Sequence, residues 1–222
     1  MGYYLPAKTR RSRFVEMFGD PSANPKSWPI VELADVLVAI GNGKSFVCES
    51  FPRIGDAPAI LKLSAATWGV YKPEENKALK PDSKYYPECE VRNGDLLFTR
   101  KNTFELVGMC AYVTKTPPNL MLPDLIFRLE TKDKIDKLYL ANLINFDTFR
   151  ASVRSLASGS AASMPNISKS RLLGLKVPLP PLALQREFAA FVAEVDKSEF
   201  AVRKRLEKAR QLYRAKLQEY FG

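Results

Sequence analysis

The 222-residue sequence contains no histidine and only three cysteines. Without histidine, Ser-His-Asp and Cys-His nucleophile pairs, imidazole acid–base catalysis and histidine-ligated zinc are all excluded. Cys48, Cys89 and Cys110 are far apart and form no CxxC pair, so neither a zinc knuckle nor a disulfide framework is indicated. We therefore expect no metal site.

Long apolar runs are also missing. No stretch approaches the roughly 18 apolar residues of a membrane span, and residues 1–14 lack the apolar run of a signal peptide. The chain has 34 Lys plus Arg against 24 Asp plus Glu, a formal net charge of +10. We expect a soluble cytoplasmic protein that binds no membrane and meets a polyanion, most simply nucleic acid.

Pattern divides the chain into three parts. Residues 1–19 read as the end of a helix that stops at Gly19, with Pro21 beyond it. Residues 20–177 contain short apolar runs separated by turn residues, with two helical stretches among them, and predict a mixed domain with a twisted β-sheet. Residues 178–222 predict one long helix of the coiled-coil type. The expected fold class is therefore α+β.

The middle part contains four apolar runs that predict strands and two that predict helices. The strands are expected at 59–63, 95–99, 106–113 and 124–129, and the helices at 137–145 and 146–157, where apolar residues recur every three or four positions.

The third part has no proline or glycine between Pro181 and Gly222. About 40 helical residues would extend roughly 60 Å, which is too long to fold against one small domain. Positions spaced alternately four and three residues apart from Phe188 to Tyr220 are apolar in eight cases of ten, against nine of the other 23 residues. Further apolar residues outside these positions indicate additional packing partners. A single amphipathic helix lying on its own domain is the alternative.

The two ends of the chain resemble each other. When residues 8–19 are laid over residues 211–222, four of twelve positions are identical, including Phe18 with Phe221 and Gly19 with Gly222. This offset of 203 residues suggests one period of a unit that could be doubled elsewhere.

Catalytic and nucleotide-binding motifs are incomplete in this sequence. Residues 41–45, GNGKS, imitate the end of a phosphate-binding P-loop, but Val38 stands where its first glycine is needed and Phe46 breaks a dinucleotide-binding G-x-G-x-x-G pattern. Acidic pairs such as Glu74–Glu75 lie in turn-rich, solvated contexts. We expect no catalytic residue.

Positive charge is concentrated between Asp147 and Glu187, where six cations and no acidic residue occur. This span includes the small-residue loop 158–168, whose hydroxyl and amide groups could reach phosphates and base edges, and the segment 168–171 could start a short helix aimed at a phosphate. Residues 99–103 place arginine and asparagine, which bind guanine and adenine, directly after a strand. Residues 42–45 are a third candidate segment. An ordinary polar loop is the alternative for each.

Several segments together resemble the specificity subunit of type I restriction-modification systems. They are SRFVEMFGDPSANPKSWPIVEL at 12–33, GNGKS at 41–45, NGDLLFTRKNT at 93–103 and SMPNISKSRLLGLKVPLPPLALQREFAAFV at 163–192, followed by a long helix ending LQEYFG. Together they span nearly the whole chain, and the proline-flanked segment combined with the FGDP start is the most specific of these features.

The resemblance implies a non-catalytic subunit of bacteria or archaea. By this resemblance, the chain would have a DNA target-recognition domain at 20–177, the end of a conserved-region helix at 1–19, and a second such helix at 178–222. Full-length members carry two units whose helices pair antiparallel, so that each domain reads half of a split double-stranded DNA target. Methyltransferase subunits hold S-adenosylmethionine and methylate adenine N6, a restriction subunit joins for cleavage, and this chain would bind no cofactor. With one unit, it would be a half-subunit that forms a homodimer or pairs with a second half-subunit, or a fragment of a longer protein.

Two sets of site residues follow. The predicted DNA-binding residues are Lys44, Ser45, Arg100, Lys101, Asn102, Thr103, Ser160, Ser163, Asn166, Ser168, Lys169 and Arg171. The predicted helix and partner contacts are Phe188, Phe191, Val192, Val195, Phe200, Val202, Leu206, Leu212, Tyr213, Leu217 and Tyr220. The competing hypothesis is a helical assembly adaptor or decoy for methyltransferase subunits whose globular domain does not read DNA.

Overall fold

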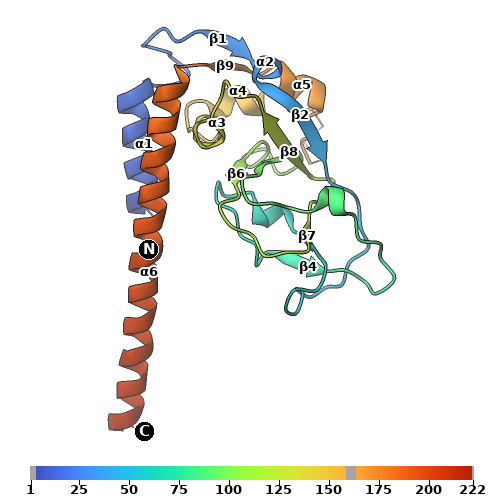
Figure 1. Cartoon of the computed structure of the whole chain (residues 1–222), viewed down its shortest axis with the longest axis vertical. Coiled ribbons are helices and arrows are strands. Elements are labelled where there is room, and N and C mark those ends of the chain that lie inside the picture. Colours follow the sequence, from blue (N-terminus) through green and yellow to red (C-terminus); the bar gives the residue numbers. More distant parts are fainter. Residues whose placement is uncertain (1–3, 159–163, 222) are drawn as a thin grey trace.

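The computed structural model describes residues 4–158 and 164–221. A mixed domain lies beside a long helix, α6, which extends far beyond it, and α1 lies along the upper part of α6 (Figure 1). This arrangement confirms the predicted α+β class. The helices are α1 (Tyr4–Phe18), α2 (Leu33–Val36), α3 (Lys137–Ile144), α4 (Arg150–Arg154), α5 (Lys169–Leu173) and α6 (Leu182–Phe221), with short 3-10 turns at Leu63–Ala65 and Pro87–Cys89.

Nine strands form three sheets within the described chain. The largest has the antiparallel order β2-β8-β5-β6, the second has the order β4-β3-β7 with β3 and β7 parallel, and β1 pairs with β9 alone. The strands are β1 (Ile30–Glu32), β2 (Leu37–Asn42), β3 (Ala59–Leu61), β4 (Asn76–Ala78), β5 (Leu96–Thr99), β6 (Cys110–Tyr112), β7 (Leu120–Met121), β8 (Ile126–Thr131) and β9 (Lys176–Pro178).

The four-stranded sheet is covered on both faces. Leu96 and Phe98 of β5 pack into the core that holds the helices, whereas Leu97 packs into a second core under the three-stranded sheet. Because side chains alternate along a strand, a strand buried on both faces is apolar at consecutive positions, which explains the run at 96–98.

Helices α1 and α6 run antiparallel. Arg10 forms an ion pair with Asp196 and Arg13 with Glu187, so later residues of α1 meet earlier residues of α6. Between them, the Phe14 ring lies edge-on to Phe188 with ring centroids 5.4 Å apart. This aromatic contact joins α1, α6 and the core of the domain.

Helix α1 ends as its sequence predicts. Gly19 has a φ of +80°, and its N–H donates to the carbonyl of Val15 at 2.8 Å. A side chain at position 19 would also place its Cβ 2.5 Å from Cγ of Pro25, so both the conformation and the space require glycine.

Two predicted elements are shorter than expected. The strand expected at 106–113 is limited to β6, because Gly108 adopts a φ of +77° and the N–H groups of Leu106 and Val107 donate back to Thr103. The helix expected at 146–157 is limited to α4, since the chain first makes a tight turn in which the Phe149 N–H donates to the Phe146 carbonyl.

The chain enters and leaves the domain at one place. Ile30 of β1 lies opposite Pro178 of β9, so the two ends of the domain are tied together next to α6. The divisions at 19/20 and 177/178 stay a prediction.

Candidate nucleic-acid interface

The three candidate segments meet at one end of the four-stranded sheet. Asn42 at the end of β2 lies opposite Phe127 at the start of β8, next to the end of β5. Beyond β5, Lys101 forms an isolated antiparallel bridge with Asn166. Segments 42–45, 99–103 and 164–169 are therefore neighbours in space although they span more than half of the sequence.

A glycine allows the first segment to approach its neighbour. A Cβ at Gly43 would lie 2.1 Å from the carbonyl oxygen of Pro123, and Lys44 donates its N–H to the Leu122 carbonyl at 3.2 Å. Glycine is required at position 43 because two backbone segments come into contact there. The P-loop-like spelling of residues 41–45 thus has a structural explanation.

Lys44 is already engaged within the domain. Its ammonium group forms a 2.5 Å ion pair with Glu88 and lies 3.6 Å from the centre of the Tyr86 ring. The hydrogen bond to Glu88 raises the pKa of Lys44 and lowers the pKa of Glu88. To reach a phosphate, Lys44 must exchange this partner, whereas Ser45 beside it is exposed.

Two further cations gather around the buried ring of Phe127. The guanidinium carbon of Arg100 lies 5.0 Å from the ring centre, and the Lys169 ammonium lies 5.9 Å from it. Arg100 Nε donates to Oδ1 of Asn166 at 3.1 Å, and Lys169 donates to the Ile40 carbonyl. These contacts leave Arg100 and Lys169 half-buried on one surface, with their positions set by the fold.

The remaining predicted DNA contacts divide by exposure. Thr103 and Arg171 are exposed, and Arg171 donates to the Leu156 carbonyl at 3.3 Å. Lys101 and Asn166 are half-buried, and Lys101 forms no ion pair within the described chain. Ser160 and Ser163 lie outside the described residues.

The prediction that Asn102 contacts a base is wrong. Its side chain is only 6% exposed. Its amide nitrogen donates to Oγ1 of Thr67 at 3.1 Å, while its oxygen accepts from the Thr103 N–H. An amide that is enclosed and satisfied on both atoms stabilises the segment and cannot present itself to a base edge.

Two other side chains have structural roles within the domain. The Ser168 hydroxyl caps α5 by accepting from the Arg171 N–H, and its contact with a phosphate stays a prediction. Arg150 is one of the six cations of the acid-free span, but its side chain is buried and donates to the carbonyls of Gly108, Val107 and Glu105. Of the six cations in the acid-free span, Arg150 therefore belongs to the interior.

Sequence reasoning missed Phe104 and its partner Arg154. The Phe104 side chain is 57% exposed, and the guanidinium carbon of Arg154 lies 5.6 Å from its ring centre. The sequence does contain a signal for Phe104, since this aromatic residue directly follows the polar run 99–103 and is not part of a strand pattern.

The predicted contact face of α6 consists of two regions. Phe188 and Val192 are buried in the core of this chain, so their assignment to a second chain is wrong. Phe191 also packs against this core, with Arg13 over its ring, and Val195 is half-buried. The distal part of α6 is exposed, and Val202, Leu206, Tyr213 and Leu217 share one side of it, the distal face, whereas Phe200 and Leu212 project in other directions. The Tyr220 side chain lies outside the described residues.

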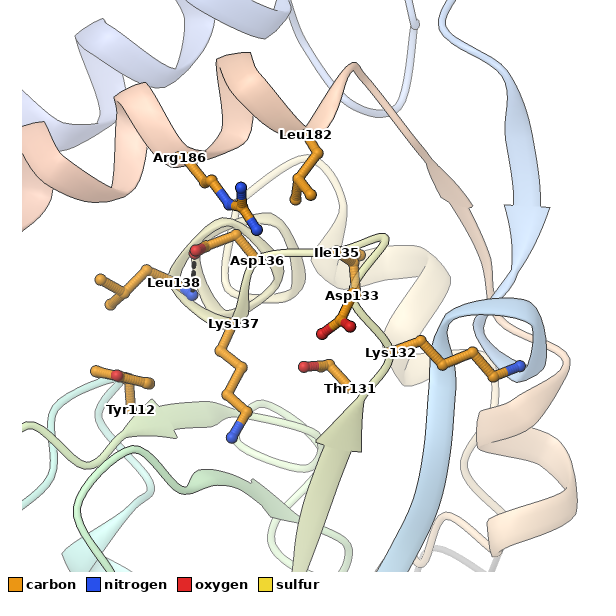
Figure 2. A pocket seen from close by; sticks show the side chains of 10 residues that line it. All are labelled: Tyr112, Thr131, Lys132, Asp133, Ile135, Asp136, Lys137, Leu138, Leu182 and Arg186. Atoms are coloured by element: carbon orange, nitrogen blue, oxygen red, sulfur yellow. Dashed lines mark hydrogen bonds between the residues drawn. The ribbon is translucent and has the colours of Figure 1, made fainter.

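A small cavity of about 210 Å³ separates the start of α6 from the sheet. Figure 2 shows Arg186 of α6 near Asp136, with Lys137 on the opposite side of α3. Asp136 caps α3 by accepting from the N–H groups of Leu138 and Tyr139. This cavity contains both acidic and basic side chains and lies at the joint between the domain and α6, away from the three candidate segments.

The described residues contain no cluster of three metal-ligating side chains. Within the same ranges, no helix combines the length and apolar character of a membrane span.

Residues 25–209 match the family model of the type I restriction modification DNA specificity domain. The chain belongs to this family. The match confirms the predicted family of specificity subunits.

Curated relatives of this specificity-domain family are similar over most of this chain. The type I restriction enzyme EcoEI specificity subunit of Escherichia coli is 30% identical over 194 residues, which are 86% of this chain and 32% of that protein. The putative MjaX specificity subunit of Methanocaldococcus jannaschii is 27% identical over 82% of this chain and 43% of that protein. The chain thus spans less than half the length of these relatives.

Solved structures of specificity subunits share the fold. The HsdS subunit from Thermoanaerobacter tengcongensis superposes with a TM-score of 0.53 at 18% identity, covering 90% of this chain and 45% of that one. The S subunit from M. genitalium gives a TM-score of 0.51 at 14% identity, covering 87% and 44%.

Proposed function

We propose that this chain recognises one half of a bipartite, double-stranded DNA target for a type I restriction-modification complex. The observation that supports this function best is the meeting of segments 42–45, 99–103 and 164–169 on one surface that carries Arg100, Lys101 and Lys169. Lysine and arginine neutralise phosphates and supply affinity, whereas side chains at base edges supply sequence selection.

In this proposal, other subunits of the complex carry out the chemistry. Methyltransferase subunits would hold S-adenosylmethionine and extract the target adenine from the stack, because chemistry on a base requires access to it outside the duplex. A restriction subunit would join for cleavage. This chain would bind no cofactor, and calorimetric titration of the purified chain with S-adenosylmethionine should give no heat of binding.

The distal face of α6 would bind other helices. Four large apolar side chains on this face, Val202, Leu206, Tyr213 and Leu217, are each between 39% and 66% exposed, which is unfavourable for a face that contacts only water. We assign this face to a second specificity unit, either another copy or a second half-subunit, and to methyltransferase subunits. The same face supports the second candidate function, an assembly adaptor without DNA readout.

A selection experiment separates the two functions. The chain, purified in complex with its methyltransferase subunits, is mixed with a pool of random duplexes, and the bound fraction is sequenced over several rounds. Enrichment of one bipartite motif, matched by methylated adenines in the genome of the source organism, is expected. Binding without any enriched sequence would contradict DNA readout and favour the adaptor.

A matched control tests which surface reads the DNA. Lys101→Ala and Lys169→Ala should each weaken binding. Each should also make the negative slope of log K against log salt shallower by about 1. Lys197→Ala, on the exposed surface of α6, should leave both quantities unchanged.

A further inference from the structure

We infer that Phe104 is a specificity-determining residue whose ring contacts the 5-methyl group of a thymine in the major groove of the target. The inference rests on the proposed DNA recognition and deepens it. It follows from the turn that carries Phe104, from the support beneath that turn, and from the charges around the exposed ring.

The turn at 103–108 is closed by its own backbone. The N–H groups of Leu106 and Val107 donate to the Thr103 carbonyl at 3.1 and 2.9 Å, and the Gly108 N–H returns to the Thr99 carbonyl at 2.8 Å. Phe104 therefore projects from the bend of a compact turn that is fastened to the end of β5.

The interior of the domain holds this turn from below. Arg150 is 6% exposed and has no carboxylate partner in the described chain. Its guanidinium donates to the carbonyls of Gly108 at 2.8 Å and Glu105 at 3.4 Å, and to that of Val107. Because a buried cation is costly unless it is hydrogen-bonded, displacement of these carbonyls is resisted. Phe104 is thus exposed on a turn whose backbone is held in place by Arg150.

The Phe104 ring faces outward despite this rigid support. It is 57% exposed, and the guanidinium carbon of Arg154 lies 5.6 Å from its ring centre. Lys101, which forms the bridge with Asn166, lies three residues before it. A fixed aromatic side chain among cations suits an apolar group that is presented by a polyanion, and the thymine methyl is the apolar group that the major groove displays.

A neighbouring acid indicates which part of the DNA the turn faces. Glu105 is exposed directly beside Phe104. Since a carboxylate is repelled by phosphates but can accept a hydrogen bond from cytosine N4, the turn is suited to base edges and not to the backbone. The cations Lys101, Lys169 and Arg171 then remain for the phosphates.

The test uses the duplex selected by the complex with the methyltransferase subunits. Each thymine of the motif is replaced in turn by deoxyuridine, which lacks only the methyl group. The unmodified protein should lose about fourfold in affinity at one position, the value of one buried carbon. Phe104→Ala should bind the original duplex more weakly and show no loss at that position, while Phe104→Leu should keep part of it.

Controls keep the outcomes distinct. Ile54→Ala removes an 85% exposed apolar side chain from a loop outside the three segments and should leave the deoxyuridine profile unchanged. A Phe104→Ala protein that still distinguishes thymine from deoxyuridine at the position where the unmodified protein does would overturn the inference and leave DNA recognition intact, as would an unmodified protein insensitive to every replacement. Absence of any selected motif would instead overturn the proposed function.

Discussion

Individual residues of the interface divide into those that face solvent and those that support them. Arg100 and Asn102 are two positions apart, yet one lies on the surface beside Phe127 and the other is enclosed with Thr67. Residues two positions apart in a regular strand point to the same side, so this difference arises because the chain bends at Asn102 after β5. A polar residue type therefore says little about contact until its side of the chain is known.

Removal of Arg100 should weaken sequence-specific binding. Arg100→Ala is expected to cost about 1–3 kcal/mol of binding free energy, the range of a lost guanidinium–base contact. Competition assays with the complex and the selected duplex would measure it. Arg92→Ala, exposed in the turn before β5, is the control. Unchanged affinity of Arg100→Ala at several salt concentrations would remove Arg100 from the readout surface.

Substitution of the buried Arg150 should lower the stability of the domain, whereas substitution of the exposed Arg171 should not. Arg150→Met leaves three carbonyls without this donor, two of them in buried contacts, and should lower the free energy of unfolding by about 3 kcal/mol. Arg171→Met, whose side chain is exposed, should change it by less than about 0.5 kcal/mol. Urea unfolding of both variants measures the difference, and equal effects would contradict the structural role of Arg150.

Elements that depend on local sequence were predictable, whereas those that depend on distant partners were not. The cap of α1 at Gly19, the length of α6 and the start of α5 at Ser168 are local features, and the prediction of each is confirmed. The two-residue strand β7 exists only because it lies parallel to β3, about 60 positions earlier. The burial of Asn102 similarly depends on Thr67, 35 residues away. Periodicity contains no information on such pairings.

The segment after β2 offers a matched pair of glycines. Gly43→Ala would place a Cβ 2.1 Å from a backbone oxygen, whereas at Gly41 the nearest atom is 3.4 Å away on a side chain. We expect Gly43→Ala to lower the free energy of unfolding by about 2 kcal/mol or more, and Gly41→Ala to change it little. Thermal unfolding compares them. If Gly43→Ala also loses DNA affinity in its folded state, segment 42–45 belongs to the interface.

At the scale of the whole molecule, α6 does two different things along its length. Its first part is built into the core through Phe188 and Val192, and its distal part exposes an apolar face. The domain can therefore be stable independently of whether the distal part is paired, since the two sets of contacts share few residues.

Association through α6 should depend on the distal part alone. Val202→Asp combined with Leu206→Asp should abolish self-association in sedimentation experiments and leave the unfolding temperature of the domain nearly unchanged, because both side chains are more than half exposed. Phe188→Asp should instead prevent folding, since its side chain is fully buried. A dimer that survives the double substitution would contradict the assignment of this face.

The antiparallel packing of α1 on α6 also determines when the molecule can be completed during synthesis. Phe14, Met17 and Phe18 are buried in a core that includes Phe188 and Val192, more than 160 positions later in the chain. Since polypeptides emerge from the ribosome in order at about 5–20 residues per second, the apolar side of α1 waits roughly ten seconds or more for its partner. Over this interval the side of α1 that packs on α6 is uncovered in the nascent chain. A chaperone would be most useful to the protein at this stage.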